Sequence, residues 1–226
     1  ENWHSIFLFA IPVSMEMDVL LYSAESLMPG STSLLQQEVE SGVSRASLLR
    51  LAAFLLGLED AGPDGVVART KRSAHNVESF GTHAAGFCSS LRFSTHAARM
   101  LKRILGKLSL TRSILSRKEI PRIELYRFCK DIEDYLPEAL LLALAWGQSH
   151  DVGHRRTASM IWEYYRDIYA EYQNNPLVTG DDIMKLLGRP AGPDVGKCLQ
   201  RVEEARAGGI VRTKSEALKF LKSTSR

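Results

Sequence analysis

The chain has few cysteines, and their spacing follows no pattern. Cys88, Cys129 and Cys198 are an odd number at irregular intervals in 226 residues. This usage argues against a disulfide framework or a CxxC-type metal knot, and it favours a reducing compartment. We expect all three thiols to behave as small buried side chains.

Long apolar runs are also lacking. The apolar stretch Ile6 to Val13 has eight residues, contains Pro12 and follows no basic segment. A membrane-spanning helix needs about 20 apolar residues, and a signal peptide needs a basic segment before its apolar one. We therefore expect this stretch to pack in a core, and we expect a cytoplasmic protein without membrane contact. The absence of an initial methionine favours a domain of a longer protein or an excised portion of one.

Patterns typical of β-strands are scarce, whereas apolar residues recur with helical spacing along most of the chain. These stripes predict an all-α fold. A segment with glycines and mixed polar residues, 60–93, is predicted to be irregular. The turn at Asn174, Asn175 and Pro176 predicts the single domain boundary, with a multi-helix body over 1–175 and a helical tail over 176–226. The stripes run over Leu48–Leu56, Leu101–Leu108, Leu140–Ala145 and Ile161–Tyr172.

Charge is unevenly distributed although the net charge is only +3. Residues 92–130 carry eleven basic and two acidic side chains, and residues 177–226 carry ten and six. The two remaining segments are acidic. Two basic blocks on a common face would present a positive path to a polyanion such as RNA. A merely solvated helix face is the alternative, but such a face normally intersperses acids. The candidate RNA contacts in the first block are Arg99, Lys102, Arg103, Lys107 and Arg112.

The tail contains two helix starts of the capping-box type. Thr179 precedes Asp182 by three residues, and Thr213 precedes Glu216 in the same way. Between them, the sequence Gly-Pro-x-x-Gly opens a helix with glycine at its cap and again in its first turn, and such a helix start can bind an anion. The alternative interpretation is that Gly-Pro merely marks the start of a helix and binds nothing. The candidate RNA contacts in the tail are Lys185, Gly192, Gly196, Lys197 and Arg201.

The order of these motifs resembles the C-terminal end of bacterial CCA-adding enzymes and the related poly(A) polymerases. The similarity runs from Gly180 to Leu218, through Gly-Pro-x-Val-Gly and the final T-x-x-E-A-L. The segment RFSTHAARMLKRILGKLSLTRSI is similar to the R-F-x-x-H segment and following helix in the body of that family. The resemblance implies a helical body followed by an RNA-binding tail.

One departure from the family concerns metal binding. Family members with a phosphohydrolase-like body carry a His-Asp pair where this chain has Leu56 and Gly57, give or take one position. A divalent metal needs several converging ligands, so His96 is left without partners. We therefore predict a degenerate HD-like body with no metal site. Two other groups contain histidines that could bind a metal. They are His75 and His83 with His96, and His150 and His154 with Asp151. For both groups a structural or solvent-exposed role is the favoured interpretation.

The tyrosines and tryptophan near Trp162 fit core packing better than base stacking. Tyr164 lies off the apolar stripe and is the candidate if any of them stacks on a base.

The family's polymerisation chemistry resides in a head with a Gly-Ser motif and D-x-D carboxylates. Here the only Gly-Ser, Gly30–Ser31, is followed by no D-x-D. The resemblance thus implies a body and tail that bind tRNA or other structured RNA, without catalytic residues. It also implies no cofactor in this chain, since Mg²⁺ and ATP or CTP would serve only the head. A degenerate HD-type phosphohydrolase or a helical protein-interaction module is the alternative. Whether the parent adds CCA, adds poly(A) or is inactive stays open, as does the oligomeric state.

Overall fold

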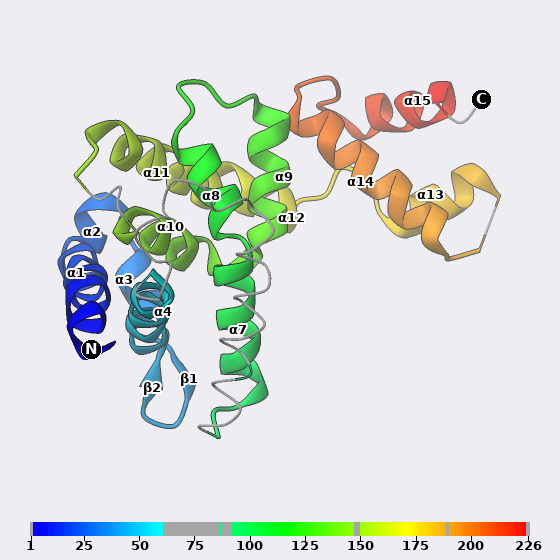
Figure 1. Cartoon of the computed structure of the whole chain (residues 1–226). Helices are drawn as coiled ribbons and strands as arrows, with labels where there is room; N and C mark the ends of the chain where they lie inside the picture. Colours follow the sequence, from blue (N-terminus) through cyan, green and yellow to red (C-terminus); the bar gives the residue numbers. More distant parts are fainter. Residues whose placement is uncertain (1, 61–85, 87–91, 147–149, 189, 225–226) are drawn as a thin grey trace. The chain divides into compact units, whose positions relative to one another are not determined.

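The computed structural model describes residues 2–60, 86, 92–146, 150–188 and 190–224 (Figure 1). Within these ranges the chain is helical apart from one two-stranded hairpin, which confirms the all-α prediction. The described part contains no helix that combines the length and apolarity needed to span a membrane.

Contacts divide the chain into two compact units. Unit 1 comprises Glu1–Lys118 and Ile132–Trp162, and unit 2 comprises Glu119–Asp131 and Glu163–Arg226. The predicted tail, 176–226, lies inside unit 2 together with two segments of the predicted body. Packing units and independently folding domains are different properties, so the boundary at 175/176 stays a prediction.

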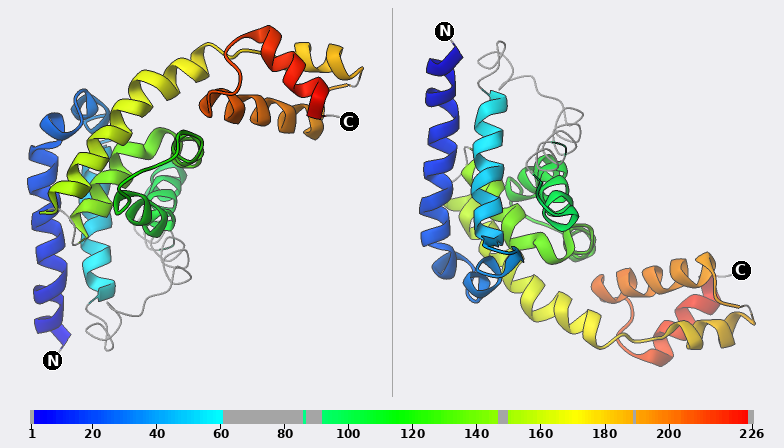
Figure 2. Two further views of the ribbon diagram at one scale, coloured as in Figure 1. Left: turned by 90° about the horizontal axis from the view of Figure 1, so that it is seen from above. Right: turned by 90° about the horizontal axis from the view of Figure 1, so that it is seen from below.

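Unit 1 is built around α10 (Leu136–Ala145), all ten residues of which are buried. A helix that is apolar on every side belongs in a core, and α10 contacts the helices on several of its sides. The long helices α1 and α4 lie side by side, as both views of Figure 2 show. The other elements of unit 1 are α1 (Asn2–Tyr22), α2 (Ala24–Leu27), α3 (Ser31–Leu35), β1 (Glu38–Glu40), β2 (Val43–Ser44), α4 (Arg45–Asp60), α7 (Thr95–Gly106), α8 (Leu108–Leu115), η1 (Glu133–Tyr135) and most of α11 (Val152–Tyr164).

The start of α7 is fixed by its cap. The Ser94 hydroxyl accepts a hydrogen bond from the Ala97 backbone N–H, and the Ser94 N–H donates to Glu40 at 2.6 Å. This second bond ties α7 to β1. The apolar stripe predicted for α7 is buried, which leaves its basic residues at the rim and on the outer face.

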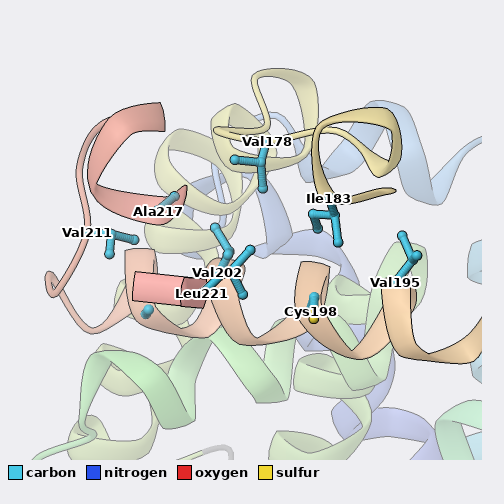
Figure 3. Packing of buried hydrophobic residues seen from close by; sticks show 9 residues of the cluster. Val178, Ile183, Val195, Cys198, Val202, Val211, Ala217 and Leu221 are labelled. Atoms are coloured by element: carbon cyan, nitrogen blue, oxygen red, sulfur yellow. The ribbon is translucent and has the colours of Figure 1, made fainter. Parts of the chain in front are cut away.

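Unit 2 has its own apolar core. Val178, Ile183, Val202, Val211 and Leu221 belong to a buried cluster that joins three tail helices and the segments between them (Figure 3). The elements of unit 2 are α9 (Arg122–Ile132), the π-helical turn η2 (Tyr165–Tyr169), α12 (Ala170–Asn174), α13 (Gly180–Leu187), α14 (Pro193–Ala207) and α15 (Lys214–Thr224).

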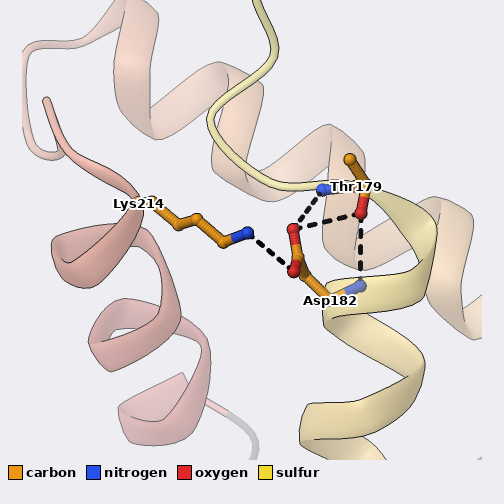
Figure 4. A network of polar contacts seen from close by, with 3 residues as sticks. All are labelled: Thr179, Asp182 and Lys214. Atoms are coloured by element: carbon orange, nitrogen blue, oxygen red, sulfur yellow. Dashed lines mark hydrogen bonds and ion pairs between the residues drawn. The ribbon is translucent and has the colours of Figure 1, made fainter.

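The predicted caps of the tail are present. Thr179 and Asp182 form a capping box at α13, and Lys214 donates to Asp182 at 2.7 Å, which links α15 to α13 (Figure 4). At α15 the Thr213 hydroxyl accepts from the Glu216 N–H, while Glu216 itself accepts from the Arg212 N–H at 2.7 Å. In an ideal capping box Glu216 would accept from the Thr213 N–H. Here it accepts from the N–H of the preceding residue, Arg212.

Candidate nucleic-acid interface

Helix α14 presents three different faces. Val195, Cys198 and Val202 point into the core of unit 2 (Figure 3). Glu203 accepts hydrogen bonds from Tyr126 at 2.7 Å and Lys130 at 2.5 Å, both on α9. Because one face is apolar and another is occupied by acidic contacts to α9, the remaining face of α14 is open to solvent.

Further contacts hold α14 in this orientation. Glu204 pairs with Arg127 of α9 at 2.5 Å, which lowers the pKa of Glu204. Arg206 pairs with Glu171 at 3.1 Å, and its guanidinium lies 4.0 Å from the centre of the Tyr172 ring. Glu203 and Glu204 of α14 are thus paired with cations of α9.

The open face of α14 is basic. Lys197 and Arg201 are one turn apart and exposed. In the part of the chain that the structure describes, neither of them pairs with a carboxylate. Two uncompensated cations on one rigid helix face suit contacts with a phosphate backbone.

The glycines at the start of α14 leave room for another molecule. Gly192 caps the helix in an extended conformation (φ 178°), and Pro193 follows at the first helical position, as predicted. A Cβ placed on Gly192 or Gly196 would meet no atom within 4 Å. Packing within the protein therefore does not require glycine at either position, and both positions border open space.

The other predicted tail residue, Lys185, is exposed on α13, the helix packed against α14. Sequence reasoning omitted further exposed cations nearby, although the basic balance of 177–226 indicated them. These are Arg212, Lys219 and Lys222.

The structure separates the predicted contacts of the central block into two groups. Arg99 and Lys102 are exposed on α7, three residues apart, and no carboxylate of the described residues pairs with them. Arg103 pairs with Glu133 at 3.0 Å and is partly covered.

The two remaining candidate contacts of the block, Arg112 and Lys107, are less exposed. The Arg112 guanidinium lies 4.4 Å from the centre of the Trp146 ring, a cation–π contact. Lys107 is half-buried at the junction where α7 ends and α8 begins. Among the candidate contacts of the block, Arg99 and Lys102 therefore form the exposed basic patch on α7.

Neither the positions of the family's metal ligands nor the other histidines considered above form a metal site among the described residues. Leu56 and Gly57 are buried, and His96 is exposed. His154 contacts Asp151 and Ser116. Within the described ranges, no group of three or more His, Cys, Asp or Glu side chains could hold a metal ion. His75 and His83 lie outside those ranges.

Two further expectations concern buried side chains. Tyr164, the candidate for base stacking, is buried with 8% exposure, so that suggestion was wrong.

Cys129 and Cys198 are free and buried, as expected, and burial raises the pKa of the Cys129 thiol. Cys88 lies outside the described residues.

These observations define a class of protein, an all-helical one with solvent-facing cations on α7 and α14. The chain belongs to the family described as tRNA nucleotidyltransferase domain 2, whose family model matches residues 75–221. That match confirms the resemblance drawn from the tail and body motifs.

Curated relatives agree with this family. The CC-adding tRNA nucleotidyltransferase of Geobacter sulfurreducens is 30% identical over 188 residues, which are 83% of this chain and 37% of that protein. The CC-adding enzyme of Thermus thermophilus is 31% identical, over 62% of this chain and 32% of its own length. The A-adding enzyme of Geobacter sulfurreducens is 31% identical over 60% of this chain. The chain thus spans about a third of the CC-adding relatives. No solved structure matches it significantly.

Proposed function

We propose that this chain is a tRNA-binding body and tail portion of a tRNA nucleotidyltransferase. The observation that carries the proposal is the exposed pair Lys197 and Arg201, beside Gly196, on a helix whose Glu203 and Glu204 are paired with α9. The family match includes this helix. Contacts of this kind recognise the phosphate backbone and the shape of RNA more than its bases.

The same proposal assigns the chemistry of nucleotide addition to another part of the parent protein. Phosphoryl transfer of this kind uses carboxylates that converge on two metal ions. The sequence has no D-x-D motif, and no metal-holding group lies among the described residues. On this account Mg²⁺ and CTP or ATP bind to the head of the parent, this chain holds no cofactor of its own, and the protein works in the cytoplasm.

The test is a measurement of tRNA affinity for a double charge reversal, Lys197→Glu with Arg201→Glu. If each side chain contacts a phosphate, the slope of log affinity against log salt should become shallower by about 2. Thermal stability should change little because exposed charges contribute little to folding.

A matched control reverses two positive charges outside α14. Arg50→Glu with Arg166→Glu alters two exposed arginines that already pair with Asp18 and Asp167. This control should retain most of the affinity. Equal affinity of the wild type and the α14 variant would refute the assignment of this face and favour a helical protein-interaction module instead.

A further inference from the structure

A cleft in unit 1 carries positive charge from residues outside the predicted RNA contacts. It lies between the end of α8 with the residues after it, Leu115–Lys118, and the first turns of α11. Its volume is about 520 Å³. Small-molecule sites typically measure about 300–1,000 Å³, so a nucleotide-sized group fits this volume.

The cleft has an excess of cations. Arg117, Lys118 and Arg156 line it, and Asp151 is the one carboxylate among its lining residues. Lys118 and Arg156 are exposed, and within the described ranges neither pairs with a carboxylate. The cleft therefore attracts anions.

The single carboxylate is already occupied. Asp151 Oδ1 accepts a hydrogen bond from the His154 N–H at 3.0 Å, which caps the start of α11 and lowers the pKa of Asp151. A Cβ on Gly153 would stand 3.0 Å from the same oxygen, so glycine at that position lets the cap form. Asp151 thus serves the helix end, and within the described ranges it pairs with neither Lys118 nor Arg156.

One histidine connects the two walls of the cleft. His154 lies with Nδ1 3.1 Å from Asp151 Oδ2 and with Nε2 3.2 Å from the hydroxyl of Ser116. These contacts hold α11 against the residues that follow α8. The two walls of the cleft are therefore joined in the absence of ligand, and preorganisation of this kind reduces the entropic cost of binding.

We propose that this cleft binds one nucleotide of an RNA strand. Lys118 and Arg156 contact its phosphodiester group, and the apolar side of the cleft at Met160 receives the ribose or base. The inference rests on the proposed RNA-binding function and adds to it a site in unit 1, formed by residues outside both sets of predicted contacts. Arginine suits this role because its guanidinium binds phosphate oxygens in a bidentate manner.

The first experiment measures tRNA affinity for Lys118→Gln with Arg156→Gln. The control is Arg50→Gln with Arg166→Gln, which removes the same charge from exposed arginines outside the cleft. The cleft variant should bind several-fold more weakly, with a salt slope shallower by about 1, because both cations contact the same phosphate. The control should resemble the wild type. Equal weakening in both variants would overturn the proposal, since it would show an effect of net charge alone.

The second experiment tests contact directly. A photoreactive benzoylphenylalanine replaces Met160 in the cleft, or Phe54 on α4 as a control; the two side chains are 39% and 40% exposed. Irradiation with tRNA should crosslink the Met160 variant and leave the Phe54 variant unlinked. The absence of a crosslink at Met160, in protein that binds tRNA normally, would overturn the proposal and leave the proposed function intact.

A third comparison separates the RNA strand from a free nucleotide. Excess AMP should leave the Met160 crosslink to tRNA in place, because a strand anchored at several phosphates outcompetes a single one. Loss of the crosslink at modest AMP concentrations would show a mononucleotide site and contradict the proposal. A wild type that binds no tRNA at all would overturn both the cleft and the proposed function.

Discussion

At the scale of single residues, the most constrained group is a buried ion pair in unit 1. Arg45 contacts Glu138 at 2.6 Å, and Glu138 is fully buried within α10. The Arg45 guanidinium also lies 5.5 Å from the centre of the Tyr135 ring and donates to the Asp134 carbonyl. Burial raises the pKa of Glu138 to about 7, and Arg45 offsets only part of that rise. This pair therefore contributes to the pH dependence of the stability of unit 1.

The sign of that dependence follows from linkage. Glu138 has a higher pKa in the folded chain than its ordinary value of 4.5, so the folded state binds the proton more tightly. Its contribution to stability is complete below about pH 4.5 and is lost as the pH rises through 7. Urea unfolding between pH 5 and 8 should therefore show the wild type losing stability relative to Glu138→Gln, which cannot ionise. Parallel curves for the two proteins would contradict this.

Removal of the cation alone gives a sharper form of the same test. Arg45→Met leaves the Glu138 carboxylate buried and unpaired, which costs about 3–5 kcal/mol at pH 8. The loss should shrink at pH 5, where Glu138 takes up a proton, and Arg45→Met with Glu138→Leu should recover most of it. A single variant as stable as the wild type at pH 8 would show that the pair is unimportant.

At the scale of elements, α7 shows how the fold selects among basic residues. Arg99 and Lys102 face solvent, while Arg103 is engaged with Glu133. Charge reversal at Arg99 and Lys102 should weaken tRNA binding to a similar degree across tRNA sequences and flatten its salt dependence, as expected for backbone contacts.

The control for α7 is a reversal at Arg103 alone. Arg103→Glu should lower thermal stability, because it places a carboxylate against Glu133, and should affect the salt slope less. Loss of affinity for some tRNA sequences and not for others would indicate base readout instead.

Local sequence signals predicted the local features well. The Thr179 capping box, the Pro193 helix start and the buried stripe of α7 each depend on residues a few positions apart. The partners of Arg103 and Arg112 lie about 30 residues downstream, so neither could be read from spacing. The short hairpin of β1 and β2 was missed because each strand has at most three residues.

The same distinction explains what was missed in the candidate sites. Tyr164 is off the apolar stripe of its own helix, yet the fold buries it. The walls of the cleft in unit 1 are separated by more than 30 residues of sequence, and Arg156 lies in a segment whose net charge is acidic. The net charge of that segment therefore gave no indication of Arg156, which the fold places in the same cleft as Lys118.

At the scale of the whole molecule, we expect the chain to bind tRNA without catalysing nucleotide addition or phosphate ester hydrolysis. The purified chain should incorporate neither CTP nor ATP into tRNA, and it should hydrolyse neither cyclic nor linear phosphate esters with Mg²⁺, Mn²⁺, Ni²⁺ or Co²⁺. The reason is the lack of converging carboxylates among the described residues and of a D-x-D motif in the sequence. Robust turnover that is abolished by His96→Ala or His150→Ala would instead support the phosphohydrolase alternative.

The most direct test of the central claim is the salt dependence of tRNA binding by the unmodified chain. The logarithm of the affinity should fall linearly with the logarithm of the salt concentration. Each phosphate contacted in a double-stranded part of the tRNA should contribute about −0.9 to the slope. Contacts from α14 and α7 together should give a slope steeper than about −3. A slope near zero, or no binding to tRNA at low salt, would contradict the account.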